Sequence, residues 1–574
     1  MGDTPPDRGE LAGDFAPAAA SRPGPGAPGA PWYRAAMTTL DWLVLGTYLA
    51  GMIGMSVFLS RGQESTDDYY VGGRNLPWWA VGISTMATQT SANSFIGIPA
   101  FVALTVGGGL TWLQYELAVP LALIFVMIFL VPFFRDLRLI SVYEYLEMRF
   151  DRPTRLVMSG VFLVSRGLAT GIGVYASAVV LSVCLDISIA LCIVIIGVVT
   201  VIYDTLGGMA AVVWSDVVQL VVLIGGLFLC IYLGVTEAGG FGAVVAAHAP
   251  ERLQGVDWGH GVGDGTGAPF WGFLIGGFFL YASYYGVDQS QAQRELSAPT
   301  TADTKKSLVF NAVARFPLTL LYVVMGLAVG AVYHASTELQ AAVPDEHLDY
   351  LVPEFIVAMV PTGLKGVLFA AILAAAMSSL DSALNSLSAA TMRDFIEPFS
   401  KITDEQTRGR RLLLWSKVTT VVWGAAMVGF AFLVGDISKT VVEGINKLGS
   451  FFYGPLLAAF LAGVLDKRAR GPAVIAGVFG GVGVNLALYL VFGEALYWMW
   501  WNLTGLVGAV LITTIVSRLM APPDPEQVKR TTLSLRDVPE RERKWMPTYG
   551  LLLLYFVALV LVAVYSADIL ALLA

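Results

Sequence analysis

Residues 77–104, PWWAVGISTMATQTSANSFIGIPAFVAL, are apolar at both ends and polar in the middle. The centre reads ATQTSANS from Ala87 to Ser94, with glycines and Pro99 close by. A helix that faces lipid has no use for these side chains, because polar groups in hydrocarbon must find partners inside the protein. A helix that breaks at its centre can use them, since its freed carbonyl oxygens can coordinate a cation. The stretch predicts a broken membrane helix that lines a cavity; a polar helix–helix contact is the alternative.

The composition indicates a membrane protein. The chain has 574 residues, of which 56% are hydrophobic and 14% are charged, whereas about 25% are charged in ordinary soluble domains. A soluble globule of this length needs more polar surface, which excludes a cytosolic enzyme, a secreted disulfide scaffold and a free nucleic-acid binder. The net charge of −8 also disfavours nucleic acid as a partner. The lipid bilayer is therefore the expected solvent for most of the chain.

Many segments are apolar over a length that can cross a bilayer, since a hydrocarbon core of about 30 Å takes about 20 helical residues. They are residues 39–60, 77–104, 110–134, 156–184, 187–206, 210–235, 268–287, 307–334, 357–391, 412–434, 442–464, 472–493, 497–517 and 549–572. We predict an all-α integral membrane protein with about 14 transmembrane helices in one polytopic domain, residues 37–574. Residues 1–36 are rich in Pro, Ala and Gly. They predict a disordered tail, or a segment ahead of a true start at Met37.

Lysine and arginine in the loops predict the orientation. If the first span runs from outside to inside, most of the 35 basic residues fall in inside connections. The outside segments are poor in them, since residues 236–267 contain Arg252 alone and residues 335–350 contain none. This alternation keeps its phase along the whole chain. It predicts a multi-pass protein of the cell membrane, inner or plasma, with both termini outside.

Residues that carry most covalent and metal chemistry are scarce. The three cysteines lie inside apolar runs, and the four histidines fall in loops or at a helix end. We find no nucleotide-binding loop, nucleophile elbow or transition-metal motif in the sequence. The sequence therefore predicts that the protein is not an enzyme and has no cofactor.

A second polar stripe lies in residues 370–395, AAILAAAMSSLDSALNSLSAATMRDF. Its small and polar side chains recur every three or four residues, so they share one face of a helix. They are Ala375, Ser378, Ser379, Ser382, Asn385 and Ser386. A packing seam needs only small residues, whereas Asp381 adds a carboxylate that requires a partner cation. Hydroxyl and carboxylate oxygens are hard ligands, which suit a hard cation and not copper or zinc.

These stretches, with two others, resemble the sodium/solute symporter family of sugar, proline, sialate, iodide, vitamin and monocarboxylate carriers. The others are DTLGGMAAVVWSDVVQ (204–219) and DQSQAQRELSA (288–298), and the lead-in YYVGGRNLPWW begins at Tyr69. The resemblance covers about residues 40–520. It implies a LeuT-like core of two inverted five-helix repeats, residues 77–235 and 268–464, with one helix before it and three after it. It also implies a sodium-coupled symporter that imports a small polar solute, with Na⁺ as the only metal ion.

The resemblance implies a main sodium site that joins the two polar stretches. Its ligands would be backbone oxygens of Ala87 and Thr90, the carbonyl of Ala375 and the hydroxyls of Ser378 and Ser379. Some relatives have a second sodium site, which would here use Asp216, Ser378 and Ser382. Asp381 departs from the family, where a small or hydroxyl residue is common. It is open whether Asp381 adds to a second cation site with Asp216 and Ser382, holds a proton or pairs with an arginine.

The residues that would bind the solute leave its class open. Glu116 and Arg315 stand where the sugar carriers have a glutamate and a lysine that hydrogen-bond the sugar, whereas Ser94 replaces their glutamine. Residues 170–182 look more like the monocarboxylate, vitamin and iodide branch, and arginine offers a bidentate fork for a carboxylate. We expect a carboxylate-bearing solute, with a sugar as the alternative. The remaining predicted lining is Gln89, Asn93, Ser94, Tyr281, Tyr284, Asn446 and Ser450.

Two interpretations stay open beside that expectation. Arg166 is either a second anion contact or a salt bridge to an acidic neighbour. A sensor or channel built on the transporter fold is the alternative to symport.

Overall fold

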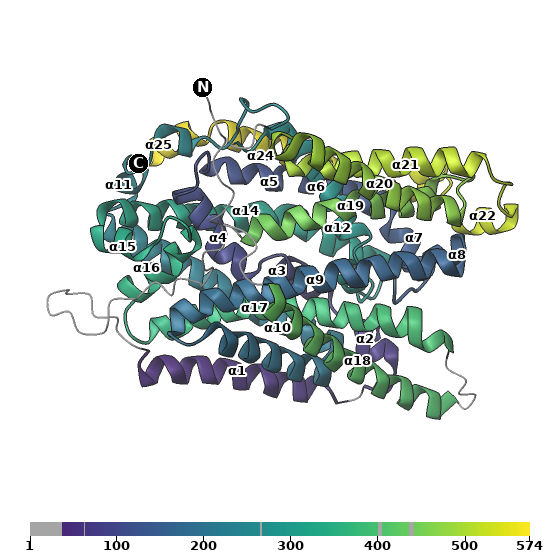
Figure 1. The fold of residues 1–574 in the computed structure, drawn as a ribbon, viewed down its shortest axis with the longest axis horizontal. Coiled ribbons are helices and arrows are strands. Elements are labelled where there is room, and N and C mark those ends of the chain that lie inside the picture. The colour runs from purple at the N-terminus through teal and green to yellow at the C-terminus, as the bar shows by residue number, and fades with distance from the viewer. Residues whose placement is uncertain (1–36, 62, 264–266, 400–404, 435–440) are drawn as a thin grey trace, which may run out of the picture. The chain divides into compact units, whose positions relative to one another are not determined.

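The computed structural model describes residues 37–574 except for 62, 264–266, 400–404 and 435–440. The described residues form helices joined by short loops, with no strand among them (Figure 1). The helices of the first half are α1 (Thr39–Leu59), α2 (Thr66–Val71), α3 (Trp78–Thr88), α4 (Ala92–Ala103), α5 (Gln114–Leu117), α6 (Val119–Phe129), α7 (Val131–Asp136), α8 (Glu144–Arg149), α9 (Arg152–Leu185), α10 (Ile189–Glu237), α11 (Phe241–Ala246), α12 (Gly277–Gly286) and α13 (Gln289–Glu295). This all-α fold is the predicted class.

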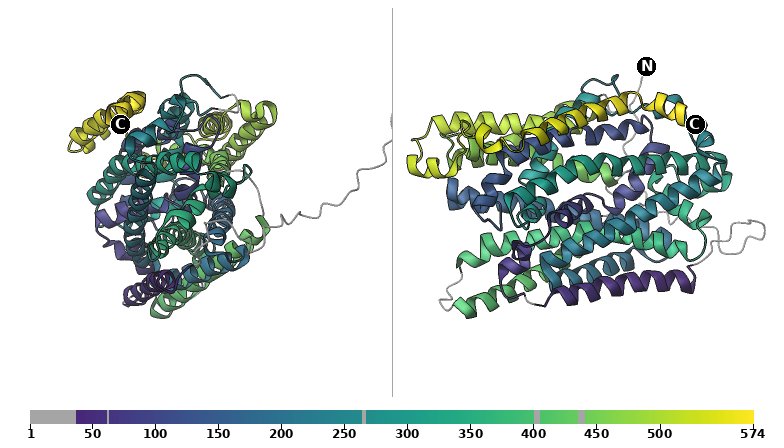
Figure 2. Two further views of the ribbon diagram at one scale, coloured as in Figure 1. Left: turned by 90° about the vertical axis from the view of Figure 1, so that its left-hand side faces the viewer. Right: turned by 180° about the vertical axis from the view of Figure 1, so that it is seen from behind.

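The second half is also helical. Its helices are α14 (Thr301–Ala335), α15 (Thr337–Ala342), α16 (Leu351–Met359), α17 (Leu364–Ala390), α18 (Glu405–Val434), α19 (Val441–Leu465), α20 (Gly471–Phe492), α21 (Trp501–Arg518), α22 (Pro525–Thr531), α23 (Val538–Glu542), α24 (Met546–Val564) and α25 (Ser566–Leu573). Figure 1 shows α1 along one edge and α20, α21 and α24 along the opposite edge, with α3 and α4 between them. The views in Figure 2 agree that the C-terminal helices lie at the periphery.

The polar stretch near residue 90 breaks its helix, as its sequence predicts. Helix α3 ends at Thr88 and α4 begins at Ala92. The Ser91 hydroxyl accepts a hydrogen bond from the Ser94 amide at 3.3 Å and so caps α4, which satisfies one of the free N–H groups at a helix start. The Thr90 hydroxyl donates to the Ala87 carbonyl at 2.7 Å. Helices α14 and α17 pack against both halves, so the break is enclosed by protein.

Helix α10 combines two predicted spans, residues 187–206 and 210–235. Its 49 residues would measure about 70 Å if straight, more than twice the hydrocarbon core. Gly208 divides it, because its φ of 54° and ψ of −155° are non-helical and belong to a region that only glycine enters readily. A Cβ at this position would lie 2.5 Å from the Tyr69 carbonyl oxygen. The two arms thus form a hairpin that closes on α2.

Ten helices of the described chain are long and apolar enough to cross a membrane. Helix α10 counts once among the ten, and the broken pair α3–α4, the 10-residue α12 and the helix α19 are not among them, so the predicted number of 14 stays a prediction. Several predicted boundaries differ from the observed helices. The span at 357–391 begins only at Leu364, because Gly363 has a φ of 87°, and the span at 549–572 is split into α24 and α25 at Tyr565.

Replacement of Gly208 by alanine should destabilise the protein, because the added Cβ meets backbone and strains φ. Gly208→Ala is expected to lower the apparent melting temperature in detergent by several degrees. Gly225→Ala is the matched control on the same helix, since a Cβ there meets nothing within 4 Å. Equal melting temperatures for the two variants would contradict this role of Gly208.

Candidate cation and substrate site

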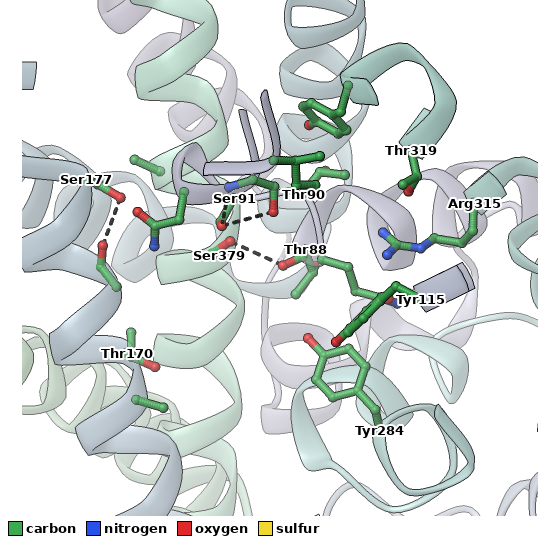
Figure 3. A pocket seen from close by; sticks show the side chains of 18 of the residues that line it. Thr88, Thr90, Ser91, Tyr115, Thr170, Ser177, Tyr284, Arg315, Thr319 and Ser379 are labelled. Atoms are coloured by element: carbon green, nitrogen blue, oxygen red, sulfur yellow. Dashed lines mark hydrogen bonds between the residues drawn. The ribbon is translucent and has the colours of Figure 1, made fainter. Parts of the chain in front are cut away.

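The broken helix meets the serine-rich helix at its break. The Ser378 hydroxyl of α17 donates to the Ala87 carbonyl at 3.3 Å and to the Ala375 carbonyl at 3.1 Å. The Ser379 hydroxyl donates to the Thr88 carbonyl at 3.2 Å (Figure 3). Residues 291 positions apart in sequence therefore share one group of hydroxyl and carbonyl oxygens. These atoms are hard, uncharged ligands of the kind that a monovalent alkali cation takes.

The ends of the two half-helices make the break electrically asymmetric. The last carbonyls of α3 carry the negative end of its dipole, and the first amides of α4 carry a positive end. Thr90 lies between them and is 2% exposed. The break therefore offers a place for a cation on the α3 side and for an anionic group on the α4 side.

The predicted second cation site contains an arginine. Asp216 of α10 accepts a hydrogen bond from Ser84 at 2.5 Å and lies 3.5 Å from the Arg294 guanidinium. Arg294, on α13, also donates to the Ser382 hydroxyl. The structure thus brings Asp216 and Ser382 together with a fixed positive charge between them. In the sequence, Arg294 is marked only as part of the stretch DQSQAQRELSA (288–298).

Asp381 lies beside this arginine but is held by other groups. One of its carboxylate oxygens accepts from the Tyr203 hydroxyl at 2.5 Å, and the other accepts from the Ser382 hydroxyl at 3.1 Å. Asp381 is fully buried. Tyr203 was not identified from the sequence, because a tyrosine in an apolar run gives no sign of its partner.

A cavity of about 180 Å³ lies beside the break. Most predicted solute contacts line it, namely Gln89, Asn93, Ser94, Glu116, Tyr281, Tyr284 and Arg315. Ser379 also lines it, so the cavity adjoins the hydroxyl pair of the candidate sodium site. Ser450 does not line it and instead accepts from the Asn502 amide at 3.1 Å. The side chain of Asn446 lies outside the described residues.

Several hydroxyl groups that line this cavity were not predicted from the sequence. They are Thr88, Ser91, Thr170, Ser177 and Thr319 (Figure 3). Thr170 and Ser177 lie two turns apart on α9, so a polar stripe at helical spacing was the available signal. These groups give the cavity hydrogen-bond donors beside its charged residues.

Arg315 is neutralised by Glu116. The guanidinium makes two contacts with the carboxylate, at 2.5 and 3.2 Å, and Glu116 also accepts from Thr319 at 3.0 Å and from Tyr281 at 3.1 Å. Arg315 is 6% exposed and Glu116 is 2% exposed. This bidentate pair satisfies both charges, so Arg315 is not a free positive charge that awaits a solute.

Arg166 is held less firmly. Its Nη1 lies 3.8 Å from an Asp288 carboxylate oxygen, and its guanidinium lies 5.8 Å from the centre of the Tyr284 ring. Its Nε has no hydrogen-bond partner within the described part of the chain. Arg166 lines both the main cavity and a smaller one of about 30 Å³ that also contains Asp288. Both interpretations of Arg166 fit this geometry. The residue makes a weak salt bridge with Asp288, and it lines the cavity, where a solute can reach it.

Comparison with known proteins identifies a family. The model of the sodium:solute symporter family matches residues 69–481. The sodium/iodide cotransporter of Homo sapiens is 31% identical over 453 residues, which are 78% of this chain and 68% of that protein. The sodium/sialic acid symporter NanT of Aliivibrio fischeri is 30% identical over 492 residues, 84% of this chain and 93% of NanT.

A solved structure gives the same family relationship. The outward-open, substrate-bound structure of a Na⁺-coupled sialic acid symporter superposes with a TM-score of 0.75 at 28% identity. The match covers 85% of this chain and 99% of that one. The fold is therefore LeuT-like, as the resemblance implied.

Removal of the Glu116 charge should destabilise the fold, because it leaves the buried Arg315 without a counter-charge. Glu116→Gln is expected to cost about 3–5 kcal/mol of unfolding free energy, measured by thermal or denaturant unfolding in detergent. The double variant Glu116→Gln, Arg315→Gln should recover part of this loss, and Glu251→Gln, at an exposed position, is the control. A double variant less stable than the single one would contradict the pairing.

Proposed function

This chain belongs to the sodium:solute symporter family, and we propose that it imports a small carboxylate-bearing solute together with Na⁺. One observation carries the proposal. The oxygens of the α3–α4 break and of the α17 hydroxyls adjoin a cavity that contains an arginine without a strong partner. A neutral sugar is the second candidate, because the Glu116–Arg315 pair resembles the charged contacts of the sugar carriers.

The main sodium site is proposed at Ala87, Thr90, Ala375, Ser378 and Ser379. Support comes from the distances of 3.1–3.3 Å that join both serine hydroxyls to carbonyls of α3 and α17. A cation there would accept the lone pairs of these oxygens and would interact with the negative end of α3. A site of neutral oxygens suits a monovalent ion, since a divalent one usually takes carboxylates.

A second cation is proposed to bind at Asp216, Asp381 and Ser382 only if Arg294 moves away. Arg294 already supplies a positive charge between Asp216 and Ser382. A second metal ion there requires the guanidinium to move, because two positive charges at contact distance repel strongly in a buried site. The coupling ion is therefore proposed to bind first at the main site.

The carboxylate of the solute is proposed to bind between Arg166 and the start of α4. Arg166 has an unpartnered Nε, and the first turn of α4 offers a positive dipole end. Asn93 and Ser94 of this turn line the cavity. The similarity to symporters named for sialic acid and iodide, both anions, is consistent with this assignment.

Sodium would drive solute uptake through its effect on conformation. A cation that bridges α3 and α17 favours the state in which these helices are joined, and a ligand shifts such an equilibrium only by its differential affinity. The membrane potential adds about 2.3 kcal/mol per charge per 100 mV to inward sodium movement. This is transport without covalent chemistry, so the protein is proposed to be no enzyme, and a channel or sensor is the less favoured alternative.

The orientation is proposed to be the one that the basic loops predict, in the cell membrane with both termini outside. The first helix is tied to the start of α17, because Asp41 accepts from the amides of Gly363 and Gly366 at 2.8 and 2.9 Å. The last helix is tied to residues 250–253, because Ser566 donates to the Leu253 carbonyl at 2.9 Å. Residues 250–253 belong to a segment predicted to lie outside, and Gly363 lies near the start of the predicted span 357–391, which is predicted to begin outside.

Loss of either hydroxyl should weaken sodium binding and leave folding intact. Ser378→Ala and Ser379→Ala are each expected to raise the half-saturating Na⁺ concentration for uptake into proteoliposomes by about ten-fold, because each removes one oxygen ligand. Ser386→Ala is the control, since Ser386 lies on the same helix and donates only to the Ala383 carbonyl. Unchanged sodium activation in both variants would refute the site.

Loss of the Arg166 charge should separate the two solute classes. Arg166→Gln is expected to weaken binding of the carboxylate by about ten-fold or more, because a charged hydrogen bond is lost, and to affect a neutral sugar little. A thermal-shift screen of carboxylates and sugars, with and without Na⁺, first identifies the solute. If Arg166→Gln binds the carboxylate as tightly as the wild type does, the anion assignment is contradicted.

A further inference from the structure

Four carboxyl groups are buried near the Arg294 guanidinium. Asp204, Asp216 and Asp381 are 0% exposed, Glu295 is 2% exposed and Arg294 is 0% exposed. No other basic side chain is hydrogen-bonded or ion-paired to these carboxyls in the part of the chain that the structure describes. Ionised carboxylates without counter-charges cost several kcal/mol each in such a setting. The group must therefore be neutralised by cations or protons beyond Arg294.

Three of the four carboxyls accept short hydrogen bonds on one or both of their oxygens. Glu295 accepts from Thr85 and Ser307, Asp381 accepts from Tyr203 and Ser382, and Asp216 accepts from Ser84 and faces Arg294. Hydrogen-bond donors of this kind stabilise the ionised form. These donors offset part of the cost of a charge on these three groups, and Asp204 has the least support of this kind.

Asp204 differs from the other three in having no close donor and no ion pair among the described residues. Its one hydrogen bond comes from the Asn385 amide, at 3.5 Å, and its other oxygen has no partner there. Asp216 also has one oxygen without a partner, but its other oxygen accepts from Ser84 at 2.5 Å and lies 3.5 Å from Arg294. A bare carboxylate oxygen that is shielded from water is unfavourable, whereas a carboxylic acid at the same place is neutral.

The groups that interact with Asp204 come from three other helices. They are Tyr69 and Tyr70 of α2, Arg294 of α13, and Asp381 and Asn385 of α17, beside Tyr203 on its own helix. Tyr69 is hydrogen-bonded to Thr420 and to the backbone carbonyl of Asp204, and Lys417 lies 6.0 Å from the centre of the Tyr69 ring. None of these groups donates a hydrogen bond to the free oxygen of Asp204.

The predicted inner end of its span lies about one helical turn from Asp204. Asp204 precedes the break of α10 at Gly208, and the Gln63 amide donates to the Gly207 carbonyl at 2.5 Å. Gln63 is partly exposed and belongs to a connection that the basic loops place inside. With this predicted orientation, the inner aqueous phase is the proton source that we assign to Asp204.

We propose that Asp204 is a proton-binding site, which takes H⁺ from the inner solution onto its unpartnered carboxylate oxygen. The carboxylate and the proton combine to a neutral carboxylic acid, and the reverse step returns the proton to water. Deprotonation adds one negative charge to the block beside the candidate sodium site. Because charges interact strongly in a buried region, Na⁺ is held more tightly when Asp204 is ionised and released more readily when it is protonated.

This proposal goes beyond solute import but uses its sodium coupling. Two measurements on the full-length protein test it. The first is the infrared difference spectrum between acid and alkaline buffer, in which a buried carboxylic acid gives its own C=O band. The second is Na⁺ affinity between about pH 5 and about pH 9, read from Na⁺-dependent thermal shift.

The wild type is expected to show the carboxylic acid band and a Na⁺ affinity that rises about three- to ten-fold with pH. Asp204→Asn, an uncharged isostere, should lose the band and keep the weaker affinity at every pH. Asp345→Asn, at an exposed loop position, should behave as the wild type. If Asp204→Asn does not fold, Asp204→Glu should show a displaced band and a pH dependence with a displaced midpoint.

The outcomes that overturn the proposal are distinct. Retention of both the band and the pH dependence in Asp204→Asn would show that another group binds the proton. If Asp204→Asn changes the cooperativity of Na⁺ binding but leaves its pH dependence unchanged, Asp204 is a ligand of a second sodium ion and not a proton site. The infrared band does not depend on transport, so a failure of the solute assignment leaves this test intact.

Discussion

The hydrogen bonds from Ser378 and Ser379 to the carbonyls of Ala87 and Thr88 hold the end of α3 in place. A helix that stops inside a membrane leaves carbonyl groups without partners, and hydrocarbon offers none. Helix α17 supplies the hydroxyls that satisfy them at 3.2–3.3 Å. The same oxygens can turn to a cation, so the requirement that stabilises the break also creates a place for Na⁺. The position of α4, and with it the cavity wall, depends on this contact.

The buried charges divide into those that are satisfied and those that are not. Arg315 has a bidentate partner in Glu116, and Arg294 is held by Asp216 and hydroxyl groups. Such pairs stabilise one arrangement of helices but offer little to a ligand. Arg166 has a contact of 3.8 Å to Asp288 and lies over the Tyr284 ring, and Asp204 has one oxygen without a hydrogen-bond partner among the described residues. The two assigned ligand contacts, one for a solute anion and one for a proton, fall on these unsatisfied groups because a ligand gains most where a buried charge lacks a partner.

Much of the fold follows from local sequence properties. Apolar length predicts the membrane helices, and the polar centre of residues 77–104 predicts the break, because both signals lie within one segment. The bend of α10 is harder to predict from the sequence, because Gly208 interrupts a segment whose composition resembles a continuous helix. The boundary at Leu364 and the division at Tyr565 were also missed, because apolar composition continues across both points and only the backbone angles reveal them.

The candidate site is accessible from sequence only in part. The residues of each polar stripe can be selected by spacing, and most of the predicted cavity lining does line the cavity. Partner choice is different, because it depends on the rotation of helices far apart in the chain. The position of Arg294 between Asp216 and Ser382, the closure of Glu116 on Arg315 and the contact of Ser450 with Asn502 are all of this kind. None has a local signature.

The most direct test of the central claim is a crystal structure of the protein in Tl⁺, an electron-rich substitute for Na⁺ whose position is visible by anomalous scattering. The account predicts a peak between the Ala87 carbonyl and the Ser378 hydroxyl that disappears when Na⁺ is added in excess. A peak elsewhere with none at this point, or an unbroken helix through Thr90, would contradict it.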